Sequence, residues 1–550
     1  MPRSFSWIHR QAVDHGVNDS EFPGKLSSRQ ISKAINYDLS KEGVFDSRGG
    51  SKKTSASATG ASETVHLAVE YRTVSSGTVT RKFLVFAGTS LYNYDTSAKT
   101  YSTLKTGLAG VKPSIAVFRD DAGLDVIYYC DGTNFEFYDG SAIVSILAKF
   151  QAGAAGAKIP RYIHAQHERL WAGGGTCDQN RVFYSPGNPA HPEQNWGGFD
   201  YVTLKGSERF TGIRDYSKNV VIGAEDNIYI ITGRGGHSGD PFIVFPVSPG
   251  IGITSHWSMI SYGGSLYFAN SNGINIGRLR AALEDGLEVE NISFNMKNTF
   301  KTIADGAWDN IEGVFFEEKQ QIYWTMKTTD ASNPDNMLVY STALSNPNEP
   351  KPIRGLDIRF VWAGYHTGLD YNSIGVIKDS NGKEKLYIGG SDGFVREYYS
   401  DFLDDRSSAD VGGSSTSYEI NPREEDEGTG SLLRGPGGNF RVHSAYPSVH
   451  MRKNGTLQWE VVINQSSRKP EDGAITITLD GNIPYFHDTD DDVTSTFGSI
   501  IFRERPIVVK KFRVGIKCKS FLPIFTNVGG DVDGEAFSFS GISYLAQRGL

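Results

Sequence analysis

Carboxylates are the residues of this sequence that could most readily support catalysis, because a pair of them can hydrolyse a glycosidic bond. One carboxyl acts as general acid and the other as nucleophile or base, so the two must flank the scissile bond. Four candidates could be recruited in this way: Asp215, Glu225, Asp240 and Glu397. No spacing selects a pair among them, so we expect them to be exposed carboxylates on loops.

Enzyme motifs are present only as fragments. Sialidases carry turns of the form Ser-x-Asp-x-Gly-x-x-Trp, and Ser391-Asp392-Gly393-Phe394 matches only the beginning of one, without a Trp at the required spacing. The sequence has no Gly-x-Ser-x-Gly elbow, and Cys177 has no evident catalytic partner apart from two histidines nearby in sequence. We therefore predict no catalytic residues and a protein that is not an enzyme.

Metal and phosphate sites are also not indicated. His164 and His167 are close in sequence, but residues three apart on a strand face opposite sides, which favours structural histidines. The acidic run Asp488 to Asp492 could bind Ca²⁺ through Asp488, Asp490, Asp491 and Asp492, although it lacks the spaced Asp-x-Asp-x-Asp-Gly pattern. The glycines at 173–175 and 233–236 do not open a helix. We predict no metal and no cofactor.

The composition favours strands and restricts the class of protein. Among 550 residues, 26 Tyr and 31 Phe far exceed 6 Met, which suits half-buried sheets. A formal net charge of -8 argues against a general nucleic-acid coat, which needs a basic face. Three widely spaced cysteines predict no disulfide framework. No apolar run reaches about 18 residues, so we expect no membrane span, and the N-terminus lacks the apolar core of a secretion signal.

One phrase recurs along the chain: an apolar strand, a turn of Gly, Asn or Asp, and an aromatic-rich strand running back. Such turns predict β-hairpins. Five clear copies occupy residues 83–94, 125–140, 220–233, 266–276 and 386–398, and two looser copies occupy 167–185 and 321–340. Seven copies over roughly 340 residues correspond to about 50 residues each, close to one four-stranded propeller blade. We predict an all-β fold with a six- or seven-bladed β-propeller.

Changes in composition divide the chain into four parts. Residues 1–60 are predicted as a polar N-terminal lead-in segment and residues 61–405 as the propeller. Residues 406–440, charged and rich in Gly and Ser, are expected to form a linker or extended loop. The alternating segments of residues 441–550 predict a small antiparallel β-sandwich, a platform domain. One short helix is expected, at residues 277–287.

The sequence of one predicted blade resembles that of a known family. His167 to Gly174, then Asn180 to Ser185, then Pro189 to Trp196 resemble a phrase in which "R-L-W-x-G" leads to "Y-S", a Pro-containing turn and a Trp. The family is the β-propeller tail nozzle, or tubular tail protein, of short-tailed bacteriophages. The resemblance extends over roughly residues 30–400 and more weakly over 440–550.

The resemblance implies a structural virion protein. Members form a homo-oligomeric ring, expected to be a hexamer, below an adaptor ring on the portal side and next to tail fibres or spikes. Genomic DNA leaves through the lumen without sequence-specific binding, which an acidic protein suits because it repels phosphates. The implied location is the virion tail, after synthesis in the host cytoplasm. The alternative is a carbohydrate-binding or glycan-degrading propeller of the tailspike or sialidase type.

Overall fold

The computed structural model describes most of residues 5–399 and the strands of residues 405–548. The gaps before Tyr399 are residues 12, 22–25, 28, 41–42, 61, 76, 121–122, 154–155, 188–195, 197–199, 206–207, 234, 236–240, 249, 280–286, 350–358 and 380. Beyond Tyr399 the described stretches are 405–406, 413–414, 419–421, 425–426, 440–451, 455–463, 471–477, 507–509, 512–518, 520–527 and 537–548.

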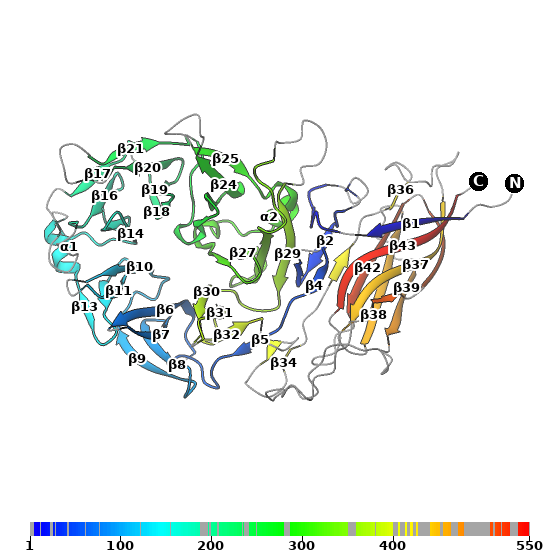
Figure 1. The fold of residues 1–550 in the computed structure, drawn as a ribbon, viewed down its shortest axis with the longest axis horizontal. Helices are drawn as coiled ribbons and strands as arrows, with labels where there is room; N and C mark the ends of the chain where they lie inside the picture. The colour runs from blue at the N-terminus through cyan, green and yellow to red at the C-terminus, as the bar shows by residue number, and fades with distance from the viewer. Residues whose placement is uncertain are drawn as a thin grey trace.

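Seven antiparallel blades of four strands surround one axis and form a β-propeller (Figure 1). Blade one comprises β6 (Val65–Ser75), β7 (Thr78–Ala87), β8 (Ser90–Asp95) and β9 (Thr100–Thr106). Blade two comprises β10 (Ser114–Arg119), β11 (Asp125–Cys130), β12 (Phe135–Tyr138) and β13 (Ile143–Ser145). Blade three comprises β14 (Tyr162–Gln166), β15 (Arg169–Gly173), β16 (Arg181–Tyr184) and β17 (Tyr201–Thr203). Blade four comprises β18 (Phe210–Tyr216), β19 (Asn219–Ala224), β20 (Ile228–Thr232) and β21 (Ile243–Pro246). Blade five comprises β22 (Ile260–Tyr262), β23 (Ser265–Asn270), β24 (Gly273–Leu279) and β25 (Leu287–Asn291). Blade six comprises β26 (Gly313–Phe316), β27 (Gln321–Met326), β28 (Asn336–Ser341) and β29 (Val361–Thr367). Blade seven comprises β30 (Ser373–Lys378), β31 (Glu384–Gly389), β32 (Val395–Tyr398) and, from the other end of the chain, β5 (Ser51–Lys53).

The recurring phrase is the central hairpin of each blade, so the prediction of a six- or seven-bladed propeller is confirmed with seven. The second and third strands of a blade lie between two neighbouring blades and are buried on both faces. All six residues of β23 and of β27 are buried, whereas the outer strand β9 is largely exposed. Burial on both faces explains why these strands are apolar runs and do not alternate.

Hydrophobic clusters hold neighbouring blades together. Phe86 of blade one packs edge-to-face against Tyr129 of blade two, with ring centroids 5.3 Å apart. On its other side, blade one places Phe83 against Tyr387 of blade seven at 4.9 Å. Full burial of one such ring stabilises the fold by roughly 1.5–3 kcal/mol. The same kind of packing recurs between successive blades around the described ring.

The turn between β14 and β15 holds two non-glycine residues in the left-handed region. His167 and Glu168 both have φ of 56°, the geometry of a type I′ turn between the paired residues Gln166 and Arg169. An L-residue in this region is strained by roughly 1–2 kcal/mol, and glycine is not.

We therefore expect Glu168→Gly to raise the free energy of unfolding by about 1 kcal/mol, measured by urea denaturation. Lys218→Gly is the matched control, because Lys218 is also exposed in a two-residue hairpin turn but is not among the residues with positive φ. An equal gain from both variants would contradict the expectation.

The predicted N-terminal lead-in of residues 1–60 is not a separate segment, because its strands are distributed over both parts of the protein. β1 (Phe5–Gln11) pairs with β43 (Phe537–Arg548) near the chain's other end. β3 (Tyr37–Leu39) pairs with β4 (Phe45–Ser47), and β4 meets β43. β5 completes blade seven, so the propeller is closed by the pairing of two distant chain segments.

The described residues of the predicted linker, 406–440, contribute strands and do not form a plain loop. They lie in β33 (Asp405–Arg406), β34 (Gly413–Ser414), β35 (Glu419–Asn421) and β36 (Glu425–Asp426). β33 extends blade seven beyond β5, and β35 joins β2 (Lys33–Ile35) to β42 (Ser520–Asn527). Because β2 also pairs with β29, one sheet runs from blade six into the C-terminal strands (Figure 1).

The C-terminal strands form two sheets that meet at aromatic side chains. The first contains β37 (Phe440–Met451), β40 (Ile507–Val509), β41 (Phe512–Cys518) and β43, and the second contains β38 (Gly455–Ile463), β39 (Glu471–Ile477) and β42. Phe525 of β42 and Phe539 of β43 bring their rings to 5.9 Å. Both belong to the hydrophobic cluster that includes the core of blade six, so the propeller and these sheets share one core.

The helix predicted at residues 277–287 is wrong. Gly277 lies in β24 opposite Val289 of β25, and Leu287 begins β25. β24 is paired on one side with β23 and on the other with β25, which fixes this segment as a strand, while residues 280–286 lie outside the described residues. Among the described residues the helices are α1 (Leu147–Gly153), α2 (Lys297–Phe300) and the 3₁₀ turns η2 (His256–Ser258), η3 (Phe294–Met296) and η4 (Trp308–Asn310).

Candidate functional site at the mouth of the propeller axis

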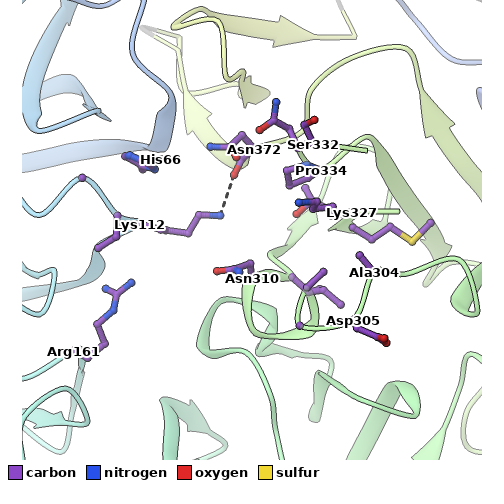
Figure 2. A pocket seen from close by; sticks show the side chains of 18 residues that line it. His66, Lys112, Arg161, Ala304, Asp305, Asn310, Lys327, Ser332, Pro334 and Asn372 are labelled. Carbon is purple, nitrogen blue, oxygen red and sulfur yellow. Dashed lines mark hydrogen bonds between the residues drawn. The ribbon is translucent and has the colours of Figure 1, made fainter. Parts of the chain in front are cut away.

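The segments that lead into the innermost strands of several blades meet at one end of the propeller axis and enclose a pocket. Its volume is about 450 Å³, and we call it the axial pocket. Residues from blades one, two, three, six and seven line it. Figure 2 shows His66, Lys112 and Arg161 on one side and Lys327, Ser332 and Asp305 on the other. Its polar lining also includes Asn310, Asn333 and Asn372.

Lys112 crosses the axis and joins blades that are not neighbours. It precedes β10 of blade two, and its Nζ lies 2.7 Å from Oε2 of Glu312, which precedes blade six. The same ammonium donates to the carbonyl oxygen of Asn372, before blade seven, at 3.1 Å (Figure 2). The two charged side chains are only 12 % and 6 % exposed. Burial raises the pKa of Glu312, although Lys112 beside it opposes that shift.

A second set of contacts fills the axis next to Lys112. His256 of η2 receives a hydrogen bond at Nδ1 from the amide of Ile213, at 3.3 Å, which leaves the proton on Nε2 to be donated to Ser114 Oγ at 2.9 Å. Burial, followed by nearby arginines and His164, lowers the pKa of His256 well below its usual value, so the ring is neutral. Trp257 Nε1 donates to the carbonyl oxygen of Pro113 at 3.2 Å. These side chains connect blades two, four and five across the axis.

Most of the charged side chains that line the axial pocket are basic: Lys112, Arg161 and Lys327 face one carboxylate, Asp305. Burial, then Lys112 and Arg161, lowers the pKa of His66 to about 4, so this imidazole is neutral at pH 7. Because Lys112 is paired with Glu312, its charge is largely balanced. Arg161 stacks its guanidinium 4.9 Å from the ring of Trp257, and its Nη1 is buried without a hydrogen-bond partner among the described residues.

The carboxylates considered for glycoside hydrolysis do not converge. Asp215 on β18 has Oδ1 3.1 Å from Nε2 of His164, and this neighbour lowers its pKa to about 2. Glu225 pairs with Arg209 at the opposite end of blade four, because β18 and β19 are antiparallel. Glu397 pairs with Lys385 in blade seven at 2.6 Å, and Asp240 lies outside the described residues.

The remaining sequence candidates are also separated. His164 lies beside Asp215, whereas His167 sits in the β14–β15 turn with its ring 6.4 Å from that of Phe242. The Ser391 to Phe394 fragment forms the β31–β32 turn, where Asp392 pairs with Arg396 at 2.5 Å. Within the described part of the chain, no group of three or more His, Cys, Asp or Glu could hold a metal ion. Asp488 to Asp492 lie outside it.

Sequence reasoning missed the axial pocket. Lys112, Arg161 and Lys327 are isolated basic residues that belong to no motif, and the first two share only a position just before the innermost strand of a blade. An exact assignment of the first strand of every blade could have placed those two at the axis, but the recurring phrase marks only the second and third strands.

No helix among the described residues is long and apolar enough to cross a membrane. No protein-family model matches this chain, and no curated protein matches it in sequence. Among solved structures, the chain is similar to a chain of the mitotic checkpoint complex, at 9 % identity and a TM-score of 0.33, over 67 % of this chain and 94 % of that one. It is also similar to Kluyveromyces lactis Hsv2 with complete loop 6CD, at 12 % identity and a TM-score of 0.27, over 50 % of this chain and 70 % of that one.

Proposed function

We propose that this protein is a structural subunit of a phage tail that assembles with copies of itself into a nozzle ring. Genomic DNA would leave through the lumen of the ring, and the outer surfaces would dock an adaptor ring and tail fibres or spikes. The observation that carries the proposal is that propeller and C-terminal sheets form one body, joined by a continuous sheet and a shared core. A body of this kind suits a wall segment that must resist load.

The segment that resembles the tail proteins, residues 167–196, supports the proposal through the packing of its residues. Trp171 of β15 is fully buried, and Arg169 lies with its guanidinium 5.2 Å from the ring of Tyr184 while donating to the carbonyl oxygen of Ser185 at 2.8 Å. Trp196, at the end of the phrase, packs its ring 5.0 Å from that of Phe150. The residues that carry the resemblance therefore build the borders of one blade with the following blade, through Trp171, and with the preceding blade, through Trp196.

The filled propeller axis determines where a DNA channel would have to lie. The contacts of Lys112, His256 and Trp257 cross the axis between blades that are not neighbours. Side chains occupy this space, so a duplex does not pass through the propeller of a single chain. In the proposed ring, the lumen lies between copies of the chain, and each propeller forms part of its wall.

Measuring the size and shape of the purified protein tests the proposal. We expect analytical ultracentrifugation to give six times the mass of one chain, and negative-stain electron microscopy to show rings with an open centre. Tailed particles purified from a lysate should contain the protein in stoichiometric amount, as measured by mass spectrometry. A protein that stays monomeric at high concentration and is absent from such particles would contradict the proposal.

A carbohydrate-binding propeller is the second candidate, and one pocket favours it. A cavity of about 540 Å³ lies between the N-terminal segment and blade six, lined by hydroxyl, amide and carboxyl side chains such as Thr302, Asn298 and Asp330. Hydroxyl-rich ligands are held by convergent groups of this kind. Binding on a glycan array that Asp330→Ala removes would favour this function, and a blank array would reject it.

A further inference from the structure

We propose that the axial pocket binds a small molecule with two anionic groups, carboxylate or phosphate, held between Arg161 and Lys327. The site is formed within a single chain, so the inference does not depend on the proposed ring. Its ligand is an oxyanion and not a polymer, because the pocket is limited to about 450 Å³ and the axis beside it is filled by His256 and Trp257.

The first argument is the balance of charge in the pocket. Lys112 is neutralised by Glu312 at 2.7 Å, which leaves Arg161 and Lys327 as cations without a paired carboxylate among the described residues. Asp305, the carboxylate that lines the pocket, is exposed at the rim, where water screens its charge. Two unbalanced cations on opposite sides of one cavity match a ligand with two anionic ends (Figure 2).

The second argument is the preorganised guanidinium of Arg161. Its backbone amide donates to the carbonyl oxygen of Gly173 at 3.0 Å, and its side chain is stacked on Trp257 at 4.9 Å. Stacking holds the planar fork in one orientation, so little freedom remains to be lost on binding. Nη1 is buried without a partner among the described residues, and such a donor is satisfied when an oxyanion accepts its hydrogen bond.

The third argument is the response of His66, which lines the same pocket. Burial is the main cause that lowers its pKa, and the nearby charges of Lys112 and Arg161 lower it further, so the imidazole responds to charge inside the cavity. An anion bound there offsets those charges and raises the pKa of His66. The pKa of His66 therefore gives a second measurement of binding. If Arg161 had only a structural role, adding the anion would not change this pKa.

The test is isothermal titration calorimetry of the full chain with two probes, pyrophosphate and succinate, at constant ionic strength. Acetate and chloride serve as monovalent comparisons. We expect at least one divalent probe to bind, and the identity of that probe distinguishes a phosphate from a carboxylate ligand. Lys327→Gln and Arg161→Gln should each weaken binding about tenfold, through loss of one charge-assisted contact. Lys149→Gln, at an exposed site on α1, is the matched control and should bind as the unmodified chain does.

Titration of ¹³C-labelled histidines gives the second readout, with His66→Gln identifying the signal. We expect the bound probe to raise the pKa of His66 from about 4. If Arg161→Gln does not fold, because the stacking on Trp257 is lost, Lys327→Gln and the histidine titration decide the question. Failure of both divalent probes to bind more tightly than acetate, or equal affinity in Lys327→Gln and Lys149→Gln, overturns the proposal.

Discussion

Removal of residues 1–54 is expected to open the propeller and abolish its cooperative unfolding transition. β5 supplies the fourth strand of blade seven, where Ser51 to Lys53 pair with Tyr398 to Arg396. The amide of Thr54 also donates to the carbonyl oxygen of Val395 at 2.9 Å. A propeller closed by two distant segments loses the closure of its ring when one of them is deleted. The expected loss is about 5 kcal/mol or more, comparable to the whole stability of many domains.

Circular dichroism and amide hydrogen exchange during thermal unfolding measure this effect. The matched control is removal of residues 1–11, which deletes β1 from its pairing with β43 and leaves β5 in place. We expect the shorter deletion to retain the cooperative transition of the propeller. If removal of residues 1–54 shifts the midpoint no further than removal of residues 1–11, closure by β5 is not what stabilises the ring.

The sequence predicts the blades because their central strands carry a strong signal, and it misses the closure because β5 carries none. β27 is buried along its whole length and is therefore an apolar run, which is recognisable without knowledge of its neighbours. β5 consists of Ser51, Lys52 and Lys53, the composition of an edge strand or a loop. Its pairing with β32 on one side and β33 on the other, both more than 300 residues later in the chain, makes it a strand.

The candidate site was not predictable for a related reason. Lys112 and Glu312 stand 200 residues apart and meet only because the blades close into a ring. Searches for catalytic or metal sites rely on short spacings between residues, whereas contacts across the axis connect one turn in each of several blades. Asp215 and Glu225 illustrate the opposite case, since they are close in sequence but lie at opposite ends of one blade.

Replacement of Asp38 by alanine is expected to lower the free energy of unfolding by about 3 kcal/mol, because it removes one partner of a buried ion pair. Asp38 of β3 is almost fully buried and lies 2.6 Å from Nζ of Lys319 in blade six. Tyr399, directly after blade seven, donates to it at 2.7 Å, and Nε2 of His366 in β29 lies 3.5 Å away. This carboxylate therefore connects the N-terminal segment to the last two blades. Lys319 is 32 % exposed and can turn to water, so the expected loss is at the lower end for such pairs.

The pH dependence of the same variant separates the charge of Asp38 from its packing. Burial alone would raise the pKa of Asp38. The charge of Lys319 and the other groups around the carboxylate lower it by more than burial raises it, so the folded value lies below the ordinary 3.8. A depressed pKa stabilises the folded state above the unfolded value, and this contribution is lost as the pH falls through the folded value. The difference in stability between the unmodified chain and Asp38→Ala should therefore shrink below about pH 4.

Urea denaturation at pH 7 and at several lower pH values down to about pH 2.5 measures both quantities, and two further variants complete the comparison. Asp226→Ala, at an exposed position in the turn between β19 and β20, is expected to change stability by less than about 0.5 kcal/mol. Asp38→Asn keeps an oxygen that can accept from Tyr399 but removes the charge, so it isolates the ion pair with Lys319. A loss in Asp38→Ala that does not exceed that of Asp226→Ala, or that stays constant as the solution is acidified, would show that the ion pair does not stabilise this junction. A loss that appears in both Asp38 variants and diminishes in acid assigns the stabilisation to the charge itself, which joins the start of the chain to the blades that close the ring.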